Sequence, residues 1–208
     1  MKHMKLLMNI CLVVLIIFAG TACWGDGNGP TQQLKPTLEE VLRILDDPAL
    51  QGDENKEDRR RSIMTSISAG FDFREMSRRV LGKTWNDISN EQKDYFVVQV
   101  TKLLENVYIG KLEDYGGSEV EFVAERIKGK RAQVTTLISY EQSKIPIHYI
   151  MQKEQEAWMV YDINIEGVSL VRNYMEQFRT ILRESEYKGL INVIEEKNKS
   201  FAEGNGNN

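Results

Sequence analysis

Cysteine and histidine are scarce in this chain of 208 residues and an excess of positive charge is lacking, and each of these features excludes a class of protein. The chain holds two cysteines, and Cys11 lies in an apolar leader, so the processed chain keeps at most Cys23 and forms no internal disulfide. It holds two histidines, and it lacks the HExxH, CxxC, GxSxG and glycine-rich phosphate-loop signatures of common enzymes. The net charge of -4 argues against nucleic acid as a partner, because binding to phosphates requires clustered positive charge. What is abundant instead is apolar surface at regular spacing.

The first residues predict export. Lys2 and Lys5 precede an apolar run over residues 6–18, and four small residues follow at 19–22. The run is too short to span a bilayer comfortably, and its charged start and small-residue end are typical of a secretory signal. We therefore expect residues 1–22 to be a signal peptide that is removed from the mature protein.

The residues after the signal leave the mature N-terminus open to two outcomes. A cysteine directly after the cleavage point resembles the lipidation site of a bacterial lipoprotein, and lipidation of Cys23 would tether the protein to a membrane. Gly20, however, stands where that signal usually has a larger aliphatic residue, so ordinary cleavage is the alternative. The composition of residues 23–34 predicts a flexible linker, followed by a folded domain at 35–201 and a disordered tail at 202–208.

Capping boxes and helical spacing predict the helices of the first half. A capping box is a Ser, Thr or Asp followed three residues later by Glu or Gln. Gly82 ends a short helix, and apolar residues at intervals of three and four run from Phe96 to Tyr115 until Gly116 and Gly117 stop a long one. The predicted capping boxes are Thr37 with Glu40, Asp72 with Glu75, and Ser89 with Gln92.

A basic run, Arg59 to Arg61, opens a further helix whose Ile63 and Ile67 point inward. Because carboxylates are interspersed with these arginines, we interpret the run as a solvated helix face. Contact with anionic lipid headgroups or with a partner is the alternative.

The second half of the chain alternates like strands and then returns to helical spacing. Short turns, including Lys128-Gly129-Lys130, separate the strands and indicate hairpins. We predict strands at residues 119–127, 131–140, 145–152 and 158–165, and helices at 169–184 and 187–201. This order indicates an α+β fold, a four-stranded antiparallel meander that curves with helices packed on one face.

Three stretches also resemble a known family. They are FDFREMSRRVLGKTW at 71–85, SNEQKDYFVVQVTKLLENVYIGKLEDY at 89–115 and WMVYDINIEGVSLVRNYMEQF at 158–178. In this order they resemble the MlaC family, the phospholipid-binding auxiliary proteins of ABC transporters in Gram-negative bacteria. One departure is Met175, where a basic residue is expected in the family.

The resemblance implies a cone-shaped, NTF2-like arrangement in which sheet and helices enclose an apolar cavity. It also implies that some apolar side chains line that cavity rather than the protein's own core. We expect them at the centre of the long helix, on the inward faces of the third and fourth strands, and at the start of the next helix. The expected lipid-binding residues are Phe73, Met76, Trp85, Phe96, Val100, Leu103, Leu104, Val107, Tyr108, Val134, Ile147, Tyr149, Trp158, Val160, Leu170, Val171 and Tyr174.

By the same resemblance, the protein is a periplasmic shuttle and not an enzyme. It would carry glycerophospholipid between an outer-membrane lipoprotein–porin complex and an inner-membrane ABC transporter complex with its substrate-binding subunit, and so maintain outer-membrane lipid asymmetry. No cofactor or metal is implied. Exposing two acyl chains to water would cost about 25 kcal/mol, at about 0.8 kcal/mol per methylene. A carrier therefore needs an apolar interior.

Two other functions stay open on the residues alone. Asp162 with a tyrosine such as Tyr149 could transfer protons in a small-molecule enzyme on the same scaffold. The plainer interpretation is that Asp162 pairs with an arginine or caps a backbone group, and that His148 is an exposed strand residue. The other alternative is a non-lipid exported interaction module, whose apolar residues form only a core or a partner groove.

Overall fold

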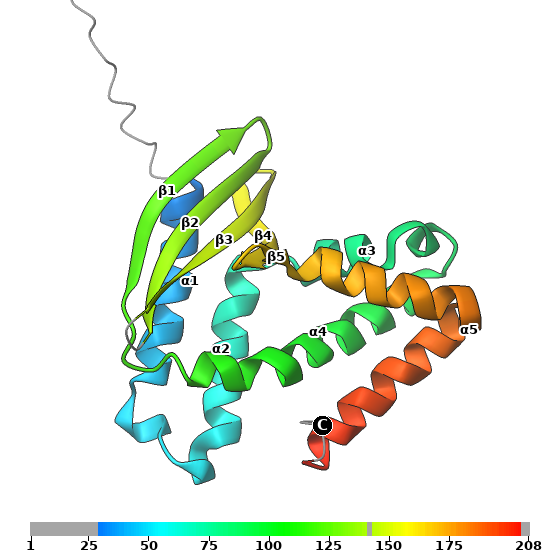
Figure 1. Ribbon diagram of the computed structural model, residues 1–208, viewed down its shortest axis with the longest axis horizontal. Coiled ribbons are helices and arrows are strands. Elements are labelled where there is room, and N and C mark those ends of the chain that lie inside the picture. The colour runs from blue at the N-terminus through cyan, green and yellow to red at the C-terminus, as the bar shows by residue number, and fades with distance from the viewer. Residues whose placement is uncertain (1–28, 141–142, 205–208) are drawn as a thin grey trace, which may run out of the picture.

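An antiparallel sheet and five helices make up residues 29–140 and 143–204, the part of the chain that the computed structural model describes (Figure 1). The predicted signal peptide, Cys23 and the end of the tail lie outside these residues. The helices are α1 (Pro30–Leu45), α2 (Lys56–Gly70), α3 (Phe73–Leu81), α4 (Asn90–Glu113) and α5 (Leu170–Ala202), with short 3-10 helices at Pro48–Leu50, Asp53–Asn55 and Gly82–Asn86. The strands are β1 (Val120–Lys128), β2 (Arg131–Tyr140), β3 (Ser143–Glu154), β4 (Ala157–Ile165) and β5 (Val168–Ser169).

The sheet confirms the predicted α+β class and the antiparallel meander. Its strands follow the order β1-β2-β3-β4-β5, and each pairs with the next. Gly129 and Gln155 adopt positive φ angles of 61° and 52° in the tight turns after β1 and β3. Strand β5 is a difference, because Ser169 was expected at the start of a helix and instead pairs with the end of β4. The Ser169 hydroxyl also accepts a hydrogen bond from the Arg172 amide at 3.0 Å, which caps α5.

Helix α1 begins earlier than the sequence predicts. It starts at Pro30, so residues 30–34 are helical rather than part of a flexible linker, and Thr37 is not its N-cap. Proline is well suited to the first helical position, where the missing N–H has no helical partner. Pro36 lies inside the helix and removes one internal hydrogen bond. Such a helix therefore depends on contacts with the rest of the molecule.

Those contacts come from the sheet and from α2. Leu34 is fully buried against the sheet. The side chain of Gln33 accepts a hydrogen bond from the Trp158 amide at 2.7 Å and so attaches α1 to the start of β4. Thr37 packs against Gly70, where a Cβ would lie 2.8 Å from the threonine hydroxyl, so the close approach of α1 and α2 requires glycine.

The other two predicted helix starts are confirmed. Asp72 accepts a hydrogen bond from the Glu75 amide at 2.8 Å, and Gly82 ends α3 with a φ of 63°. Both hydrogen bonds of the capping box at Ser89 are present. Helix α4 is 24 residues long and ends at Glu113, three residues before the first of the two glycines.

Helix α5 consists of two segments, as the sequence predicts. Glu186 interrupts it with φ 54° and ψ -167°, and the chain then turns back (Figure 1). The second segment buries Leu190 and Ile194 against α3 and α4. The three helices α3, α4 and α5 thus form one body beside the sheet.

Candidate functional site

The apolar interior is divided into three clusters. The helical core joins α3, α4 and α5, and Phe96 and Val100 lie at its centre. The sheet core joins the inner face of the sheet to α1 around Val134 and Met151. A smaller cluster around Ile63 and Ile109 joins α1, α2 and the end of α4. The sheet and the helical body are therefore packed largely by separate sets of side chains.

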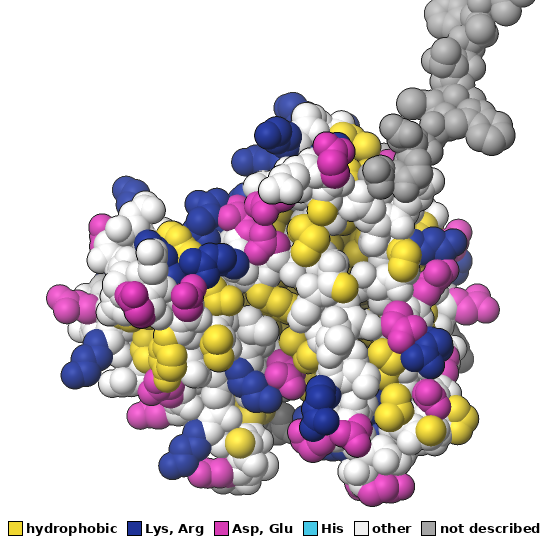
Figure 2. Space-filling model, turned by 180° about the vertical axis from the view of Figure 1, so that it is seen from behind, with side chains coloured by type: hydrophobic (Ala, Val, Ile, Leu, Met, Phe, Trp, Pro, Cys, Tyr) yellow, Lys and Arg dark blue, Asp and Glu magenta, His cyan; other side chains and the backbone are white. Residues whose placement is uncertain are grey.

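The helical core and the sheet core meet at Phe73, and we call this contact the seam. Phe73 is partly buried and packs against both cores. Its ring stacks on Phe71 of the sheet core at a centroid distance of 6.4 Å. Helices α3 and α5 reach the sheet through β4, and the backbone of Phe71 forms an isolated bridge with Val160 on that strand. Seen from behind, hydrophobic side chains reach the surface at several places between the helical body and the sheet (Figure 2).

The predicted lipid-binding residues lie on both sides of the seam instead of around one open space. The helical core contains those from α3 and α4 and the start of α5, with Val107 and Tyr108 partly buried at its margin. The sheet core contains those from the strands, and Leu170 is buried outside both clusters. The helical core holds Met76, Trp85, Phe96, Val100, Leu103, Leu104, Val107, Tyr108, Val171 and Tyr174, and the sheet core holds Val134, Ile147, Tyr149, Trp158 and Val160.

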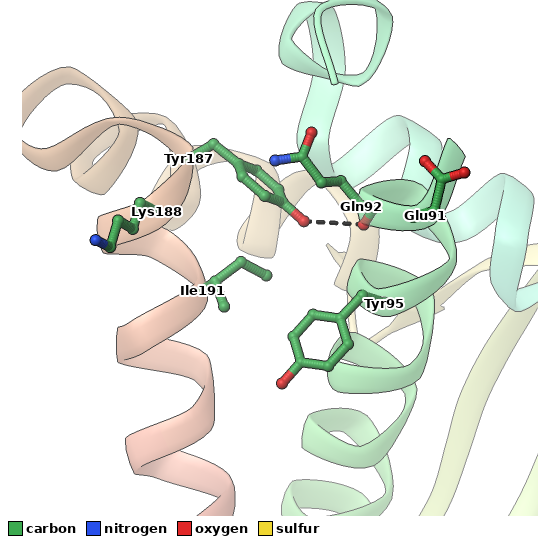
Figure 3. A pocket seen from close by; sticks show the side chains of 6 residues that line it. All are labelled: Glu91, Gln92, Tyr95, Tyr187, Lys188 and Ile191. Carbon is green, nitrogen blue, oxygen red and sulfur yellow. Dashed lines mark hydrogen bonds between the residues drawn. The ribbon is translucent and has the colours of Figure 1, made fainter. Parts of the chain in front are cut away.

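Two hollows stand out in the described part of the chain, and neither lies between the two cores. One, of about 370 Å³, lies between the first turns of α4 and the second segment of α5 (Figure 3). There the Tyr187 hydroxyl donates to the Gln92 carbonyl at 2.9 Å. The other, of about 350 Å³, has a charged lining that includes Arg74 and Glu75. These volumes are near the lower limit for small-ligand pockets, about 300 Å³, whereas a phospholipid is a large ligand.

Two buried or half-buried tyrosines, Tyr174 and Tyr108, belong to the helical core. Burial raises the pKa of Tyr174, which is 7% exposed, and it also raises the pKa of Tyr108. The Nζ of Lys111 lies 5.6 Å from the centre of the Tyr108 ring. These phenols remain neutral at physiological pH, and the charge beside them is the ammonium group of Lys111.

Asp162 caps a helix, as the plainer interpretation proposed. One carboxylate oxygen accepts a hydrogen bond from the Val171 amide at 3.0 Å, and the other accepts one from the Ser169 hydroxyl at 2.6 Å. A carboxylate at a helix N-terminus satisfies amides that have no helical partner. Asp162 therefore fixes the start of α5 on β4.

The structure does not bring Asp162 and Tyr149 together. Tyr149 lies opposite Ile163 in the β3–β4 ladder, and successive residues of a strand point to opposite faces. Asp162 consequently points to the outer face, whereas Tyr149 is buried in the sheet core. Burial raises the pKa of Tyr149 to about 12, which makes it a poor proton donor near neutral pH.

His148 is less exposed than the sequence predicts. It is half-buried, and its Nδ1 lies 3.0 Å from the Thr135 hydroxyl and 3.3 Å from the Gln133 amide nitrogen. These partners belong to the neighbouring strand β2, so His148 takes part in a polar contact across the sheet.

The interpretation of the basic run as a solvated face is wrong for two of its three arginines. Arg59 and Arg60 both bind the carboxylate of Glu113 at the end of α4, at 2.8 Å and 3.1 Å. Their side chains are 12% and 23% exposed. Only Arg61 fits the prediction, because it is 75% exposed and pairs with Asp58. The arginines connect α2 to α4 and have little surface left for a lipid headgroup.

The sequence also missed Leu34, which it assigned to the linker. Leu34 lies four residues before Leu38, so extending the apolar stripe backward across Pro36 would have found it. Among the described helices, none is both long and apolar enough to cross a membrane. In the same residues, no group of three His, Cys, Asp or Glu side chains is placed to hold a metal ion.

Fold and seam together define an α+β protein with a curved antiparallel meander and an apolar interior in three clusters, the two larger of which meet at the seam. The family model described as "MlaC protein" matches residues 35–196, and the chain belongs to this family. A solved structure of a phospholipid-binding protein from Ralstonia solanacearum, in complex with a phospholipid, is similar with a TM-score of 0.77 and 24% sequence identity. The similarity covers 83% of this chain and 98% of the Ralstonia chain and confirms the fold. A comparison with curated protein sequences gives no match.

Proposed function

We propose that this protein binds glycerophospholipid and carries it through the periplasm. The observation that carries the proposal is the family match over residues 35–196. Two further observations support it: the similar Ralstonia protein was solved with a phospholipid, and the interior here is divided where acyl chains could enter. The proposal involves no chemical step. The hydrogen bonds of Asp162 to Ser169 and Val171 give this carboxylate a structural role, so no catalytic role is needed to explain it.

In this proposal the acyl chains enter the seam and separate the two cores. Phe73 packs against both cores and is only partly buried, so it can turn aside at small cost. Side chains of the helical core, including Val171 and Tyr174, would then contact acyl chains in place of one another. Apolar contacts between the two cores are replaced by apolar contacts with the acyl chains. At the same time the methylenes of the lipid are no longer exposed to water, which is favourable. Closed cores without lipid and parted cores with lipid can therefore be close in free energy.

The proposed partners are those of the family. Lipid would be exchanged with an outer-membrane lipoprotein–porin complex and with an inner-membrane ABC transporter complex that has its own substrate-binding subunit. A carrier that bound lipid far more tightly than a membrane would not release it, so a balanced affinity lets the partners set the direction. Such transport would contribute to outer-membrane lipid asymmetry.

The proposal is tested by identifying what the protein retains after gentle purification. Native mass spectrometry and solvent extraction should find one phospholipid for each copy of the chain. A protein free of lipid, which also takes up none from vesicles, would contradict the proposal and favour the interaction module. Mass spectrometry of the mature N-terminus separately distinguishes lipidation of Cys23 from ordinary cleavage.

A further inference from the structure

Strand β1 leaves one edge of the sheet open. Among the described residues, no strand pairs with its outer side, whereas β5 covers part of the opposite edge at β4. Residues 123–128 are all exposed, and Val123 and Ile127 keep 43% and 51% of their surfaces in contact with solvent. An open edge is a row of unpaired backbone N–H and C=O groups to which another strand can add.

Charges and a bulge on an edge strand often serve to prevent such pairing, and β1 has both. Val123 is the extra residue of a bulge between Phe122 and Ala124. On the outer face of the sheet, however, the charges are ordered along the strand, with Glu119 and Glu121 before the bulge and Arg126 and Lys128 after it. Glu125 also follows the bulge, but it lies on the inner face, where its carboxylate accepts a hydrogen bond from the Thr31 amide at 2.8 Å. Two copies of such a strand running in opposite directions place acid opposite base.

We propose that β1 pairs antiparallel with β1 of a second copy of this chain, in the register that sets the two bulges opposite each other. In that register Glu121 lies opposite Arg126 of the second copy, and Glu119 opposite its Lys128. Val120 lies opposite its Ile127, which would cover an exposed apolar side chain. Each pair occurs twice because the arrangement is symmetric.

The faces of the strand agree with this register. Glu121 and Arg126 lie opposite Leu137 and Gln133 of β2 on the outer face of the sheet. Val120 and Ile127 lie opposite Ile138 and Ala132, which are buried on the inner face. An unbroken strand would put positions 121 and 126 on opposite faces, but the bulge shifts the alternation by one residue. Directly opposed residues of an antiparallel pair share a face, so the bulge makes this self-pairing possible.

The charges are also available. Within the described part of the chain, Arg126 and Lys128 make no ion pair. Glu121 pairs with Lys144 at 2.9 Å, but both side chains are more than half exposed, so this pair holds it only weakly. The seam lies at β4, three strands away from β1, so the pairing would leave the proposed lipid site accessible. One pair of short strands buries little surface, and the dimer should therefore be weak and dependent on concentration.

A charge exchange tests the pairing, with analytical ultracentrifugation over a wide range of concentrations as the measurement. Arg126→Glu and Glu121→Arg each place like charges opposite one another twice in the dimer. Each should raise the dissociation constant about tenfold or more. The double variant, E121R with R126E, restores both opposite-charge pairs and should restore dimerisation. Arg183→Glu on helix α5 makes the same charge change at an exposed position outside the sheet, and Lys144→Ala removes the internal partner of Glu121; both should dimerise as the parent does.

Three results would overturn the proposal. They are a chain that stays monomeric at every concentration, a dimer that neither single variant weakens, and a double variant that dimerises no better than the singles. The retained lipid, measured on the same samples, is independent of these outcomes. A failure of the dimer can thus be told apart from a failure of the proposed function.

Discussion

At the scale of single residues, Asp162 connects the sheet to the first turn of α5. Its two hydrogen bonds to Val171 and Ser169 are lost in Asp162→Ala. We expect this variant to lower the free energy of unfolding by about 1–2 kcal/mol, the usual cost of losing a helix cap. Urea denaturation followed by circular dichroism measures the change.

Asp162→Asn separates the structural role from a catalytic one. The amide keeps one acceptor for the Val171 amide, so we expect a smaller loss of stability and an unchanged phospholipid content. Any small-molecule turnover that the parent protein shows and this variant lacks would revive the enzyme hypothesis.

Because the Tyr149 phenol is buried, we expect the protein to lose stability at alkaline pH. Burial raises its pKa from 10.0 to about 12 in the folded protein. The folded state therefore favours the protonated phenol, and this contribution is complete below pH 10 and is lost as the pH rises toward 12. The expected slope is about 1.4 kcal/mol per pH unit in that window. Tyr149→Phe should flatten the slope in urea titrations at successive pH values. An unchanged slope would assign the effect to another buried phenol such as Tyr174.

At the scale of elements, the link between α2 and α4 depends on Glu113. Burial alone would raise the pKa of Glu113, but hydrogen bonds from Arg60 and Arg59 outweigh it and lower the pKa. Arg59 also donates to the Leu50 carbonyl at 2.7 Å, so the same contact fixes the loop before α2.

Replacing Glu113 should release this link. Glu113→Gln leaves two poorly exposed arginines without their carboxylate, and we expect a loss of about 2 kcal/mol, less than the 3–5 kcal/mol for a fully buried pair. Because the folded pKa is lowered, the contribution is present above about pH 4.3 and disappears as the pH falls below it. Thermal unfolding at pH 7 and pH 3 should show a large difference between variant and parent only at pH 7.

At the break in α5 we expect two substitutions to change the stability of the protein in opposite directions. Glu186 occupies a backbone region that glycine adopts readily, so Glu186→Gly should stabilise the protein by about 1 kcal/mol. Gly189→Ala should destabilise it by about 1–3 kcal/mol, because the added methyl group would collide with Ser185. Gly110→Ala in α4 is the control, since its methyl group meets nothing within 4 Å and helix propensity improves. If Gly189→Ala and Gly110→Ala changed the free energy of unfolding equally, the close contact between Gly189 and Ser185 would be contradicted.

Elements were largely predictable where local signals and packing agree. The capping box at Ser89, the glycine at 82 and the alternation of the strands determine most of the observed boundaries. The start of α1 was not predictable in this way, because Pro36 and the glycine-rich residues before it suggest a linker. Leu34 continues the apolar stripe of Leu38, but the hydrogen bond of Gln33 becomes apparent only through the sheet, which begins much later, at Val120.

At the scale of the whole molecule, the spacing of apolar residues identified the interior. It did not show which of these residues belong to the helical core and which to the sheet core. Val100 and Val134 have the same kind of periodic signal, yet one packs among helices and the other against the sheet. Which residues face which core depends on how α5 and α1 are placed, and local sequence does not encode that. The residues that line a bound lipid therefore stay a proposal.

A bulky side chain in the helical core, where α5 begins beside β4, should compete with lipid. Val171 is 9% exposed at the start of α5, and Val171→Trp would occupy the space that acyl chains are proposed to take. We expect its phospholipid content, measured by native mass spectrometry, to fall at least tenfold while circular dichroism stays that of a folded protein. Val98→Trp is the matched control, because Val98 is 62% exposed on α4. Equal lipid content in the two variants would place the lipid elsewhere.

The early start of α1 sets a limit on any membrane attachment. With Pro30 already in the folded domain, only residues 24–29 separate it from Cys23. Fully extended, that stretch reaches at most about 25 Å, no more than the thickness of the membrane itself. A molecule held by a lipid on Cys23 could exchange cargo with complexes in its own bilayer, whereas delivery to the opposite membrane would require the unmodified, freely diffusing form.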